Sequence, residues 1–261
     1  MYIMNISCNV PNIIFIVPYR NRLDNLRKFV EHMKGLIDFP KYEIYFSHQC
    51  DNRPFNRGAM KNIGFIAIKN KYPNHYKDIT IVINDVDTYY SDVNSVSYDT
   101  VKGTVMHFFG FNFALGGIFS IKGCDYELST GFPNFWGWGL EDNAMQDRCL
   151  SNGIKIDRSL CVPIIDSRIV STHNSDIKVI SLRDSNDFRI KNMDSLPDIV
   201  NIKYNIVPLL DMVNVFMVNV SNFAIPSDPS KCIFNRWSAT RNKSKLKYMP
   251  EHMLRRNWNM F

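Results

Sequence analysis

The sequence predicts an α/β fold built on a mostly parallel, mixed sheet, because strand-like and helix-like segments alternate along the first third of the chain. Residues 13–17 and 79–83 are short, mostly apolar runs of the kind that form buried strands, and residues 42–47 also have the pattern of a strand. Residues 23–37 and 58–69 lie between these runs and have the pattern of helices. Strands that alternate with helices in this way typically form a parallel sheet with helices on both faces.

Each element has its own signal along the chain. The first apolar run ends at Pro18, and the helix after it repeats apolar residues at steps of three and four from Leu23 to Ile37. The third run ends abruptly in Asn-Asp-Val-Asp at residues 84–87. Strand candidates follow at residues 104–109, 118–121 and 201–220, and a helix candidate at residues 141–151. Parallel sheets bind ligands beyond the carboxyl ends of their strands, so the polar residues after the first and third runs should lie close together.

Charge is distributed unevenly along the chain. The 261 residues are 45% apolar, which is enough for a substantial core, and carry a formal net charge of +6. Residues 222–261 hold eight basic and two acidic residues, so the first 221 residues have no net charge. We therefore expect a main domain over residues 1–221 and a basic C-terminal extension over residues 222–261. The neutral main domain argues against a nucleic-acid-binding protein, although the basic and aromatic tail leaves such binding open beside a simple solvated extension.

No segment has the pattern of a membrane or secretion signal. Residues 1–10 lack a basic start followed by an apolar stretch, and no run approaches the roughly 20 apolar residues of a membrane span. The six cysteines lack the spacing of metal ligands, and reduced thiols fit a cytosol-like compartment. We expect a cytoplasmic protein.

Asp85 and Asp87 form the first candidate site. Residues i and i+2 of a strand face the same side, so two carboxylates at a strand end can share a divalent cation or divide the work between metal and ligand. A solvated turn is the alternative explanation, because a lone Asp-x-Asp is common. If His173 joins Asp87, the mixed nitrogen and oxygen ligands favour Mn²⁺ over Mg²⁺, and the ion would neutralise a departing diphosphate. A histidine alone is more often structural or simply exposed.

Trp136 and Trp138 lie among glycines directly before Glu141 and Asp142. Glycines let a loop move, and a tryptophan face suits the apolar face of a sugar ring. A carboxylate at a helix start tends to stay ionised because the helix dipole favours negative charge, and an ionised carboxylate can act as a general base. Helix capping by acidic residues explains the same pattern equally well.

Arg20, Arg22 and Arg57 are candidates for contacts with a diphosphate. The planar guanidinium group binds phosphate oxygens through paired hydrogen bonds. Taken singly, each arginine is more often an ordinary surface charge.

These segments, taken together and in order, resemble the β-1,4-galactosyltransferase family. The matching motifs are Val17-Pro-Tyr-Arg-Asn-Arg22, Phe55-Asn-Arg-Gly58, Lys61-Asn-Ile-Gly-Phe65, Asp85-Val-Asp87, Gly116-Gly117, Gly131-Phe-Pro-Asn134, Trp136-Gly-Trp-Gly139, Glu141-Asp142 and His173. The similarity covers residues 11–175 and continues faintly to residue 220. It implies a catalytic domain with the GT-A, nucleotide-diphosphosugar transferase fold over residues 1–221.

The resemblance also implies a role for each matching residue. The donor, a UDP-sugar, would be bound by Pro18, Tyr19, Arg20, Asn21, Arg22, Phe55, Asn56, Arg57, Asp85, Val86, Asp87, Gly117, Trp138 and His173. Asp87 and His173 would bind Mn²⁺, and Trp138 would lie on a mobile loop that closes over the donor. The acceptor sugar would be contacted by Leu140, Glu141, Asp142 and Asn143. Asp142 would be the base of an inverting, single-displacement transfer.

Departures from the family pattern bear on the metal, the acceptor and the donor. Val170 stands where the family often has a methionine as a further metal ligand. Leu140 and Asn143 replace a glycine and an acid in the acceptor segment. Ala114 stands where a bulky tyrosine restricts the donor to galactose, so space would remain for an N-acetyl group.

The resemblance therefore predicts a Mn²⁺-dependent, inverting hexosyltransferase that moves galactose or N-acetylgalactosamine from UDP-Gal or UDP-GalNAc to an acceptor sugar hydroxyl. The alternative is a sugar- or nucleotide-binding protein of the same fold that has lost turnover. The intact Asp87, Asp142 and His173 argue against it. The acceptor would be a glycan or a glycoconjugate, and no motif narrows it further.

Overall fold

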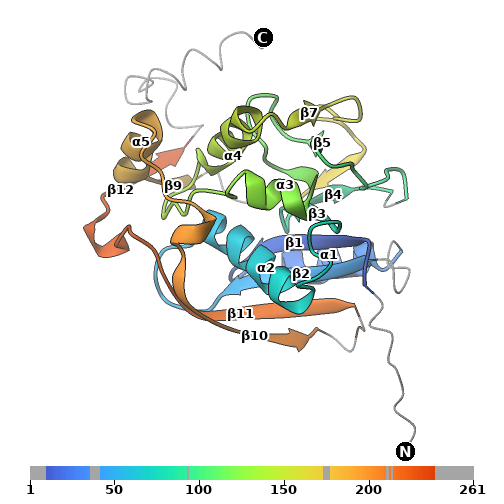
Figure 1. Ribbon diagram of the computed structural model, residues 1–261, viewed down its shortest axis with the longest axis horizontal. Helices are drawn as coiled ribbons and strands as arrows, with labels where there is room; N and C mark the ends of the chain where they lie inside the picture. The colour runs from blue at the N-terminus through green and yellow to red at the C-terminus, as the bar shows by residue number, and fades with distance from the viewer. Residues whose placement is uncertain are drawn as a thin grey trace, which may run out of the picture.

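In the residues that the structure describes, eight strands form one sheet in the order β10-β11-β2-β1-β3-β6-β5-β7 (Figure 1). The structure is a computed structural model and describes residues 10–35, 42–92, 94–172, 177–209, 212 and 214–238. The centre of the sheet is parallel, with β1 (Ile13–Tyr19) between β2 (Tyr42–Gln49) and β3 (Thr80–Asn84). β11 (Val215–Ala224) extends the parallel part beyond β2.

The outer parts of the sheet are mixed. β6 (Ile118–Lys122) runs antiparallel to β3 and to β5 (Thr104–Phe109), and β7 (Lys155–Asp157) pairs in parallel with β5. At the opposite edge, β10 (Val200–Pro208) runs antiparallel to β11. The mostly parallel, mixed sheet that the sequence predicts is confirmed.

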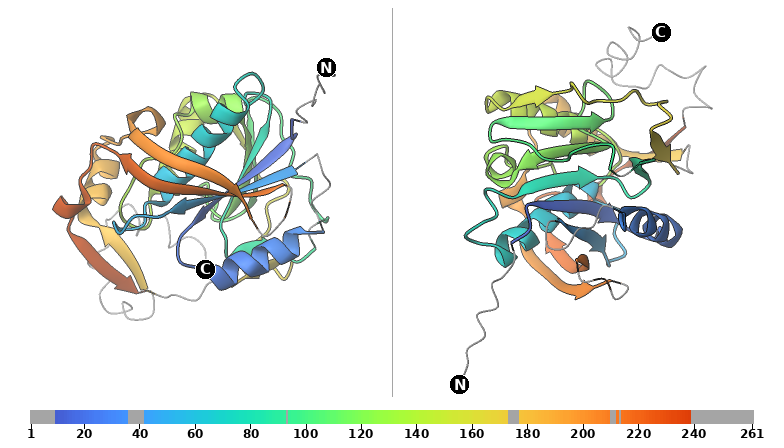
Figure 2. Two further views of the ribbon diagram at one scale, coloured as in Figure 1. Left: turned by 90° about the horizontal axis from the view of Figure 1, so that it is seen from below. Right: turned by 90° about the vertical axis from the view of Figure 1, so that its right-hand side faces the viewer.

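Helices cover both faces of the sheet, as predicted (Figure 2). α1 (Leu23–Met33) packs its apolar stripe on one face, and α2 (Arg57–Lys71) packs on the other. α3 (Gly123–Leu128) and α4 (Glu141–Ser151) lie on the same face as α2, whereas α5 (Leu182–Arg189) follows β9 near one end of the sheet (Figure 1). No helix in the described part of the chain is both long enough and apolar enough to cross a membrane.

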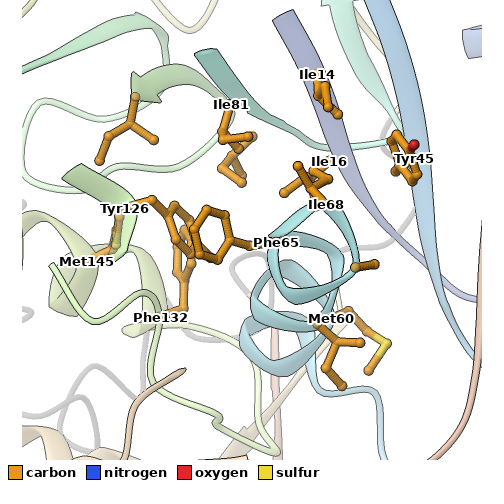
Figure 3. Packing of buried hydrophobic residues seen from close by; sticks show 14 of the residues in the cluster. Ile14, Ile16, Tyr45, Met60, Phe65, Ile68, Ile81, Tyr126, Phe132 and Met145 are labelled. Atoms are coloured by element: carbon orange, nitrogen blue, oxygen red, sulfur yellow. The ribbon is translucent and has the colours of Figure 1, made fainter. Parts of the chain in front are cut away.

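The central strand β1 is buried on both faces. Ile14 and Ile16 pack in the cluster beneath α2, which Figure 3 shows, while Phe15 and Val17 pack in the cluster beneath α1. All four are 0% exposed. A strand covered on both faces requires an apolar residue at every position, because neither side chain direction reaches water. Each such burial contributes about 1.5–3 kcal/mol relative to exposure, which explains the continuous apolar run in the sequence.

Two small antiparallel sheets were not anticipated from the sequence. β4 (Thr88–Tyr90) pairs with β8 (Ile169–Ser171), and β9 (Ile177–Ser181) pairs with β12 (Phe234–Ser238). Strands this short contain too few residues for a hydrophobic period to stand out. Both sheets nevertheless position segments of the functional site.

The expected boundary between residues 221 and 222 falls inside β11. Just beyond it, Phe223 is 1% exposed and stacks on Trp136, with ring centroids 5.7 Å apart. Residues 222–238 are therefore part of the folded body. Residues 239–261 lie outside the described residues, so a separate basic extension stays a prediction.

A buried asparagine ties α2 to the segment that leads into α4. The Asn62 side chain donates to the Phe132 carbonyl (2.8 Å) and to Asn134 Oδ1 (2.9 Å). Its Oδ1 accepts hydrogen bonds from the Tyr126 hydroxyl (2.8 Å) and the Phe132 amide (3.0 Å). Both ends of the side-chain amide are thus paired, as a fully buried amide requires.

Replacing Asn62 with alanine should lower the free energy of unfolding by at least ~2 kcal/mol, because each buried polar group left unpaired costs about 1–3 kcal/mol. Urea unfolding measures the change. The matched control is Asn70→Ala on the same helix, where the exposed side chain makes one hydrogen bond, to the Tyr204 hydroxyl. That control should cost less than about 1 kcal/mol. Equal losses for the two variants would contradict the role assigned to Asn62.

Candidate active site

A cleft of about 340 Å³ lies at the carboxyl ends of β1 and β3, where parallel sheets bind ligands. We call it the central cleft. It is lined by Pro18, Arg20, Arg22, Pro54, Phe55, Arg57, Asp85, Val86, Asp87, Trp136, Gly137, Trp138, Lys178 and Val179. The polar residues that follow the first and third strands therefore do meet in space.

Most residues expected to bind the donor line the central cleft. These are Pro18, Arg20, Arg22, Phe55, Arg57, Asp85, Val86, Asp87 and Trp138. Four others are not among its lining residues: Tyr19, Asn21, Asn56 and Gly117. The structure brings together residues from four separate parts of the chain in one concave surface.

Three residues outside the lining have positions that the fold explains. The Asn56 side chain accepts a hydrogen bond from the Ala59 amide (2.8 Å) and caps α2. Tyr19 is 7% exposed, and its ring packs edge-on against Phe46 with centroids 6.2 Å apart. Asn21 has φ 50, a left-handed conformation that asparagine tolerates and that turns the chain from β1 into α1.

Asp85 and Asp87 lie in a turn after β3 rather than on a strand. The Thr88 amide donates to the Asp85 carbonyl (3.2 Å) across this turn. The alternation of side chains along a strand therefore does not apply, and the two carboxylates bind different arginines. Arg57 Nη2 lies 2.8 Å from Asp85 Oδ1, and Arg22 Nη1 lies 2.6 Å from Asp87 Oδ2. That the two carboxylates share one cation, or divide the work between metal and ligand, stays a prediction.

The chain leading into His173 lies beside Asp87. The Thr172 amide donates to the Asp87 carbonyl (2.8 Å), and Asn25 Nδ2 donates to the Thr172 hydroxyl (2.7 Å). His173 itself lies outside the described residues. Within the described part, no group of three or more His, Cys, Asp or Glu side chains is placed to hold a metal ion. The structure therefore defines the position of Asp87 but not the whole predicted ligand set.

Glu141 and Asp142 are the first two residues of α4, and both pair with cations of α2. Arg57 Nε lies 3.1 Å from Glu141 Oε1, and Lys61 Nζ lies 2.7 Å from Asp142 Oδ1. The Glu141 side chain is 3% exposed, whereas the Asp142 side chain is 22% exposed. Of these two acids, Asp142 is the one that a ligand can reach more easily.

The other two residues of the expected acceptor segment are held by packing and hydrogen bonding. Leu140 has a left-handed backbone (φ 70) and is 5% exposed, with its side chain packed against Phe135 and Phe188. Asn143 Nδ2 donates to the Phe113 carbonyl (3.0 Å). The side chain of Leu140 therefore belongs to a small apolar cluster, while Asn143 anchors the neighbouring loop.

The charges around α2 alter one another's titration. Burial alone would raise the pKa of Asp85, but the cations of Arg57 and Lys61 outweigh it and hold that pKa below its usual value. Burial and the neighbouring charge of Asp142 raise the pKa of Glu141 in spite of the same two cations. Asp85 therefore stays ionised, while Glu141 takes up a proton more readily than a free glutamate.

The loop of residues 113–117 connects the start of α4 to the turn after β3. The Leu115 amide donates to the Asp142 carbonyl (3.0 Å). The Asp85 amide donates to the Gly117 carbonyl (3.2 Å). Because both contacts are made by backbone groups, they fix the distance between the two acidic segments regardless of the side chains around them.

Gly116 lies against the carboxylate of Asp142. A Cβ at Gly116 would lie 2.7 Å from Asp142 Oδ2, so only glycine leaves room for the carboxylate there. Arg158 Nε donates to His107 Nδ1 (3.1 Å), so the other ring nitrogen, Nε2, carries the proton and donates to the Gly116 carbonyl (3.1 Å). Burial, together with the charge of Arg158, lowers the pKa of His107 to about 4. A neutral, buried histidine thus holds Gly116 in place.

The two tryptophans have different roles. Trp136 is 2% exposed, and its indole N–H donates to a backbone carbonyl (2.8 Å), so it anchors the loop in the core. Trp138 is 38% exposed at the central cleft, with Lys178 Nζ 5.1 Å from its ring centroid. The Gly137 amide between them donates to Asp184 Oδ2 (2.7 Å). The Trp136 ring therefore lies in the core, while the Trp138 ring is exposed at the central cleft and the Trp138 amide donates to the Val179 carbonyl (2.6 Å).

Sequence reasoning did not identify Lys61, Lys178 or His107 as site residues. Lys61 had a usable signal, because it lies four residues after Arg57 and therefore shares a helical face with it. Lys178 lines the cleft from β9, where burial and the charge of Arg57 lower its pKa. Neither Lys178 nor His107 belongs to a motif, so only the packing of the chain revealed them.

Comparison with protein families supports a shared ancestry for this arrangement. The model of the N-terminal region of glycosyl transferase group 7 matches residues 6–98. The model of the N-terminal domain of galactosyltransferase matches residues 104–172. Together these matches cover more than half of the chain.

Individual relatives are distant. β-1,4-Galactosyltransferase 7 of Homo sapiens is 29% identical over 149 residues, which are 55% of this chain and 45% of that protein. β-1,4-Galactosyltransferase 1 of Bos taurus is 27% identical over 166 residues, which are 58% of this chain and 40% of that protein. The chain thus spans about half of the length of the curated relatives that it matches.

Two crystal structures share the fold. The catalytic domain of Drosophila β-1,4-galactosyltransferase 7 with xylobiose aligns with a TM-score of 0.63 and 21% identity, over 85% of this chain and 97% of that chain. A mutant of the Drosophila enzyme with manganese, UDP-Gal and xylobiose aligns with a TM-score of 0.62 and 23% identity. The fold is therefore the GT-A fold that the resemblance implies.

Acid should destabilise the protein through His107. Its pKa is about 4 in the folded state against 6.5 for an ordinary histidine, so the unfolded chain binds the proton first as the pH falls. The contribution of neutral His107 to the free energy of unfolding is fully present above pH ~6.5. It falls by roughly 3 kcal/mol as the pH is lowered towards ~4. His107→Gln keeps a donor for the Gly116 carbonyl but does not titrate, so its unfolding free energy in urea should fall less over this range. His75→Gln, at an exposed histidine, should keep the wild-type pH dependence.

Proposed function

The chain belongs to the β-1,4-galactosyltransferase family, and we propose that it transfers a hexose from a UDP-sugar to an acceptor sugar hydroxyl with inversion at the anomeric carbon. The observation that carries this proposal is the position of Asp142. Its partly exposed carboxylate stands at a helix start, and the cation beside it comes from the same helix as Arg57 of the central cleft. A base and a phosphate-binding surface are thus supplied by neighbouring elements.

The central cleft supports binding of a nucleotide diphosphate. Arg22, Arg57 and Lys178 bring positive charge to its walls, and guanidinium groups suit phosphate oxygens. Burial and neighbouring cations lower the pKa of Lys178, so an anion in the cleft would favour its charged form. The exposed face of Trp138 at the same cleft suits the apolar face of a sugar.

We propose Mn²⁺ as the metal, held by Asp87 and His173 together with diphosphate oxygens of the donor. Two observations support a metal ion held by these two residues. The Asp87 carboxylate lines the central cleft. Thr172, which directly precedes His173, donates its amide hydrogen to the Asp87 carbonyl (2.8 Å). Carboxylate and imidazole ligands suit Mn²⁺. When bound, the ion would neutralise the negative charge that develops on departing UDP.

Asp142 would act as the general base of a single displacement. The acceptor hydroxyl oxygen forms a bond to the anomeric carbon as the bond from that carbon to the β-phosphate oxygen breaks. UDP leaves with the electron pair, and the hydroxyl proton passes to the Asp142 carboxylate. Attack on the side opposite UDP inverts the configuration. General-base assistance of this kind contributes about 10²–10⁴-fold to the rate.

The acceptor would bind beside the start of α4, next to Glu141 and Asn143. A stacked aromatic pair, Phe111 and Phe113, lies in the adjoining loop, with ring centroids 5.0 Å apart and an interplanar angle of 17°. Phe111 is 48% exposed, and the Phe113 carbonyl accepts the hydrogen bond from Asn143. A flat aromatic face at this position suits a sugar ring, which supports a glycan or glycoconjugate acceptor.

The donor would be UDP-Gal or UDP-GalNAc. Ala114 directly precedes Leu115, whose amide is bonded to the Asp142 carbonyl (3.0 Å), so position 114 lies close to the base. The methyl side chain of Ala114 is smaller than the tyrosine of the family pattern. The difference in volume would suit the N-acetyl group of UDP-GalNAc.

Asp142→Asn should lower UDP release at least ~100-fold, because the amide cannot accept the proton. The assay uses Mn²⁺, four UDP-hexoses and simple sugar acceptors, with EDTA to test the metal requirement. UDP binding, measured by calorimetry, should stay within ~2-fold, since Asp142 would act only in the transition state. Asp147→Asn is the matched control, because Asp147 lies on the same helix and pairs at the surface with Lys191 (2.9 Å). Binding of UDP without release from any donor would instead favour a binding protein without turnover.

Ala114→Tyr should lower the ratio of the UDP-GalNAc rate to the UDP-Gal rate at least ~10-fold, since steric exclusion of one group typically discriminates by that amount or more. The UDP-Gal rate of the same variant serves as the internal control for folding. An unchanged ratio would refute the role of position 114 in donor choice.

A further inference from the structure

We propose that Lys61 is a positioning residue for the transfer reaction, fixing one oxygen of the Asp142 carboxylate so that the other accepts the proton of the acceptor hydroxyl. The proposal rests on the function proposed above, in which Asp142 is the base. It adds a residue that lies outside the central cleft and does not touch the substrate.

Lys61 is enclosed between one carboxylate and one aromatic ring. Its side chain is 1% exposed, and its Nζ lies 2.7 Å from Asp142 Oδ1. The same atom lies 4.2 Å from the centroid of the Phe132 ring, within the range of a cation–π contact. The ammonium group is therefore shielded from water and directed at Asp142.

Stability alone does not account for a lysine at this position. Moving a charge from water into a protein interior costs several kcal/mol, and apolar side chains of similar volume often replace a buried ion pair without loss. Helix neighbours such as Met60, Ile63 and Phe65 are apolar and 0% exposed. An apolar residue would continue this surface and pack against Phe132, so the charge of Lys61 is better explained by its effect on Asp142.

Two contacts orient the carboxylate of Asp142. Oδ1 accepts a hydrogen bond from Lys61, while Oδ2 lies towards Gly116, where a Cβ would approach to 2.7 Å. Gly116 is held in turn by His107 through its carbonyl (3.1 Å). The Asp142 side chain is 22% exposed and Lys61 only 1%, so a substrate reaches the carboxylate and not the ammonium. Oδ2 is left as the oxygen that can take the proton.

Lys61 also balances the charge around the base. The groups that face the pair are Arg57 on α2, Glu141 on α4, Asp85 in the turn after β3 and the neutral His107 on β5. Without the lysine, Asp142 would lose its ion pair while Asp85 and Glu141 kept theirs with Arg57, and neighbouring like charges favour uptake of a proton. A protonated carboxyl cannot serve as the base. In this proposal Lys61 exchanges no proton with the substrate.

Lys61→Met tests the proposal through steady-state UDP release measured across pH. We expect kcat near neutral pH to fall about 10–100-fold, a part of the full general-base contribution. The KM for UDP-Gal should stay within ~2-fold, because the donor site is intact. The midpoint of the acid limb of the kcat profile should shift to a pH roughly one unit higher, since the carboxylates near Lys61 lose a neighbouring cation. Lys61→Arg, which keeps the charge, should retain the wild-type acid limb.

Lys69→Met is the control, because it removes another lysine–carboxylate pair of α2, that of Lys69 with Glu127. Its kcat and pH profile should equal those of the wild type. Urea unfolding checks that each variant is folded. If Lys61→Met does not fold, Lys61→Gln, which is neutral but can donate to Oδ1, should show the shifted acid limb with a smaller loss of kcat.

The outcomes separate this proposal from the function on which it rests. If the wild type transfers sugar and Lys61→Met has the same kcat and pH profile, the role of Lys61 is overturned. The proposed transferase function is then still supported. A fall in kcat with an unshifted acid limb indicates a structural role only and also overturns the proposal. Absence of transfer by the wild type overturns both.

Discussion

Two cations on one face of α2 hold together the segments that carry the acidic residues of the site. Arg57 and Lys61 are four residues apart, so their side chains project from the same side of the helix. Arg57 binds the turn after β3 through Asp85 (2.8 Å) and α4 through Glu141 (3.1 Å), while Lys61 binds Asp142 (2.7 Å). Loss of one partner from a buried pair costs about 3–5 kcal/mol, so these three segments shift together or not at all.

The sheet and its buried polar contacts give these ion pairs a fixed frame. The parallel strands β1 and β3 end at the same edge and deliver Pro18 and Asp85 to one cleft. Next to Lys61 in the chain, Asn62 fixes the segment that leads to α4. Backbone hydrogen bonds from the loop of residues 113–117 close the arrangement from the other side. Asp85, Asp87 and Asp142 are thus each held by a cation at the carboxylate and by a backbone hydrogen bond to another segment.

The sequence by itself determined the central fold and the meeting of two polar segments at one edge of the sheet. The run at residues 13–17 is apolar throughout and the run at residues 79–83 is apolar except for Thr80, because both faces of the sheet are covered. The direction of parallel strands then requires that Arg22 and Asp85, which follow two of them, lie at one edge. Local periodicity and strand direction were sufficient for these conclusions. The helix start at Glu141 was equally clear from the sequence.

Only the tertiary structure decided which charges meet and which aromatic residues reach a ligand. Trp136 and Trp138 lie in the same glycine-rich motif, yet one is 2% and the other 38% exposed. Lys61 pairs with a residue 81 positions away, and Asp85 and Asp87 bind different arginines from the turn that follows β3. Periodicity reports which face of an element is apolar, because that depends on local geometry. The contact between two distant side chains depends on how helices and loops pack over the sheet, and that arrangement is fixed only when the whole core forms.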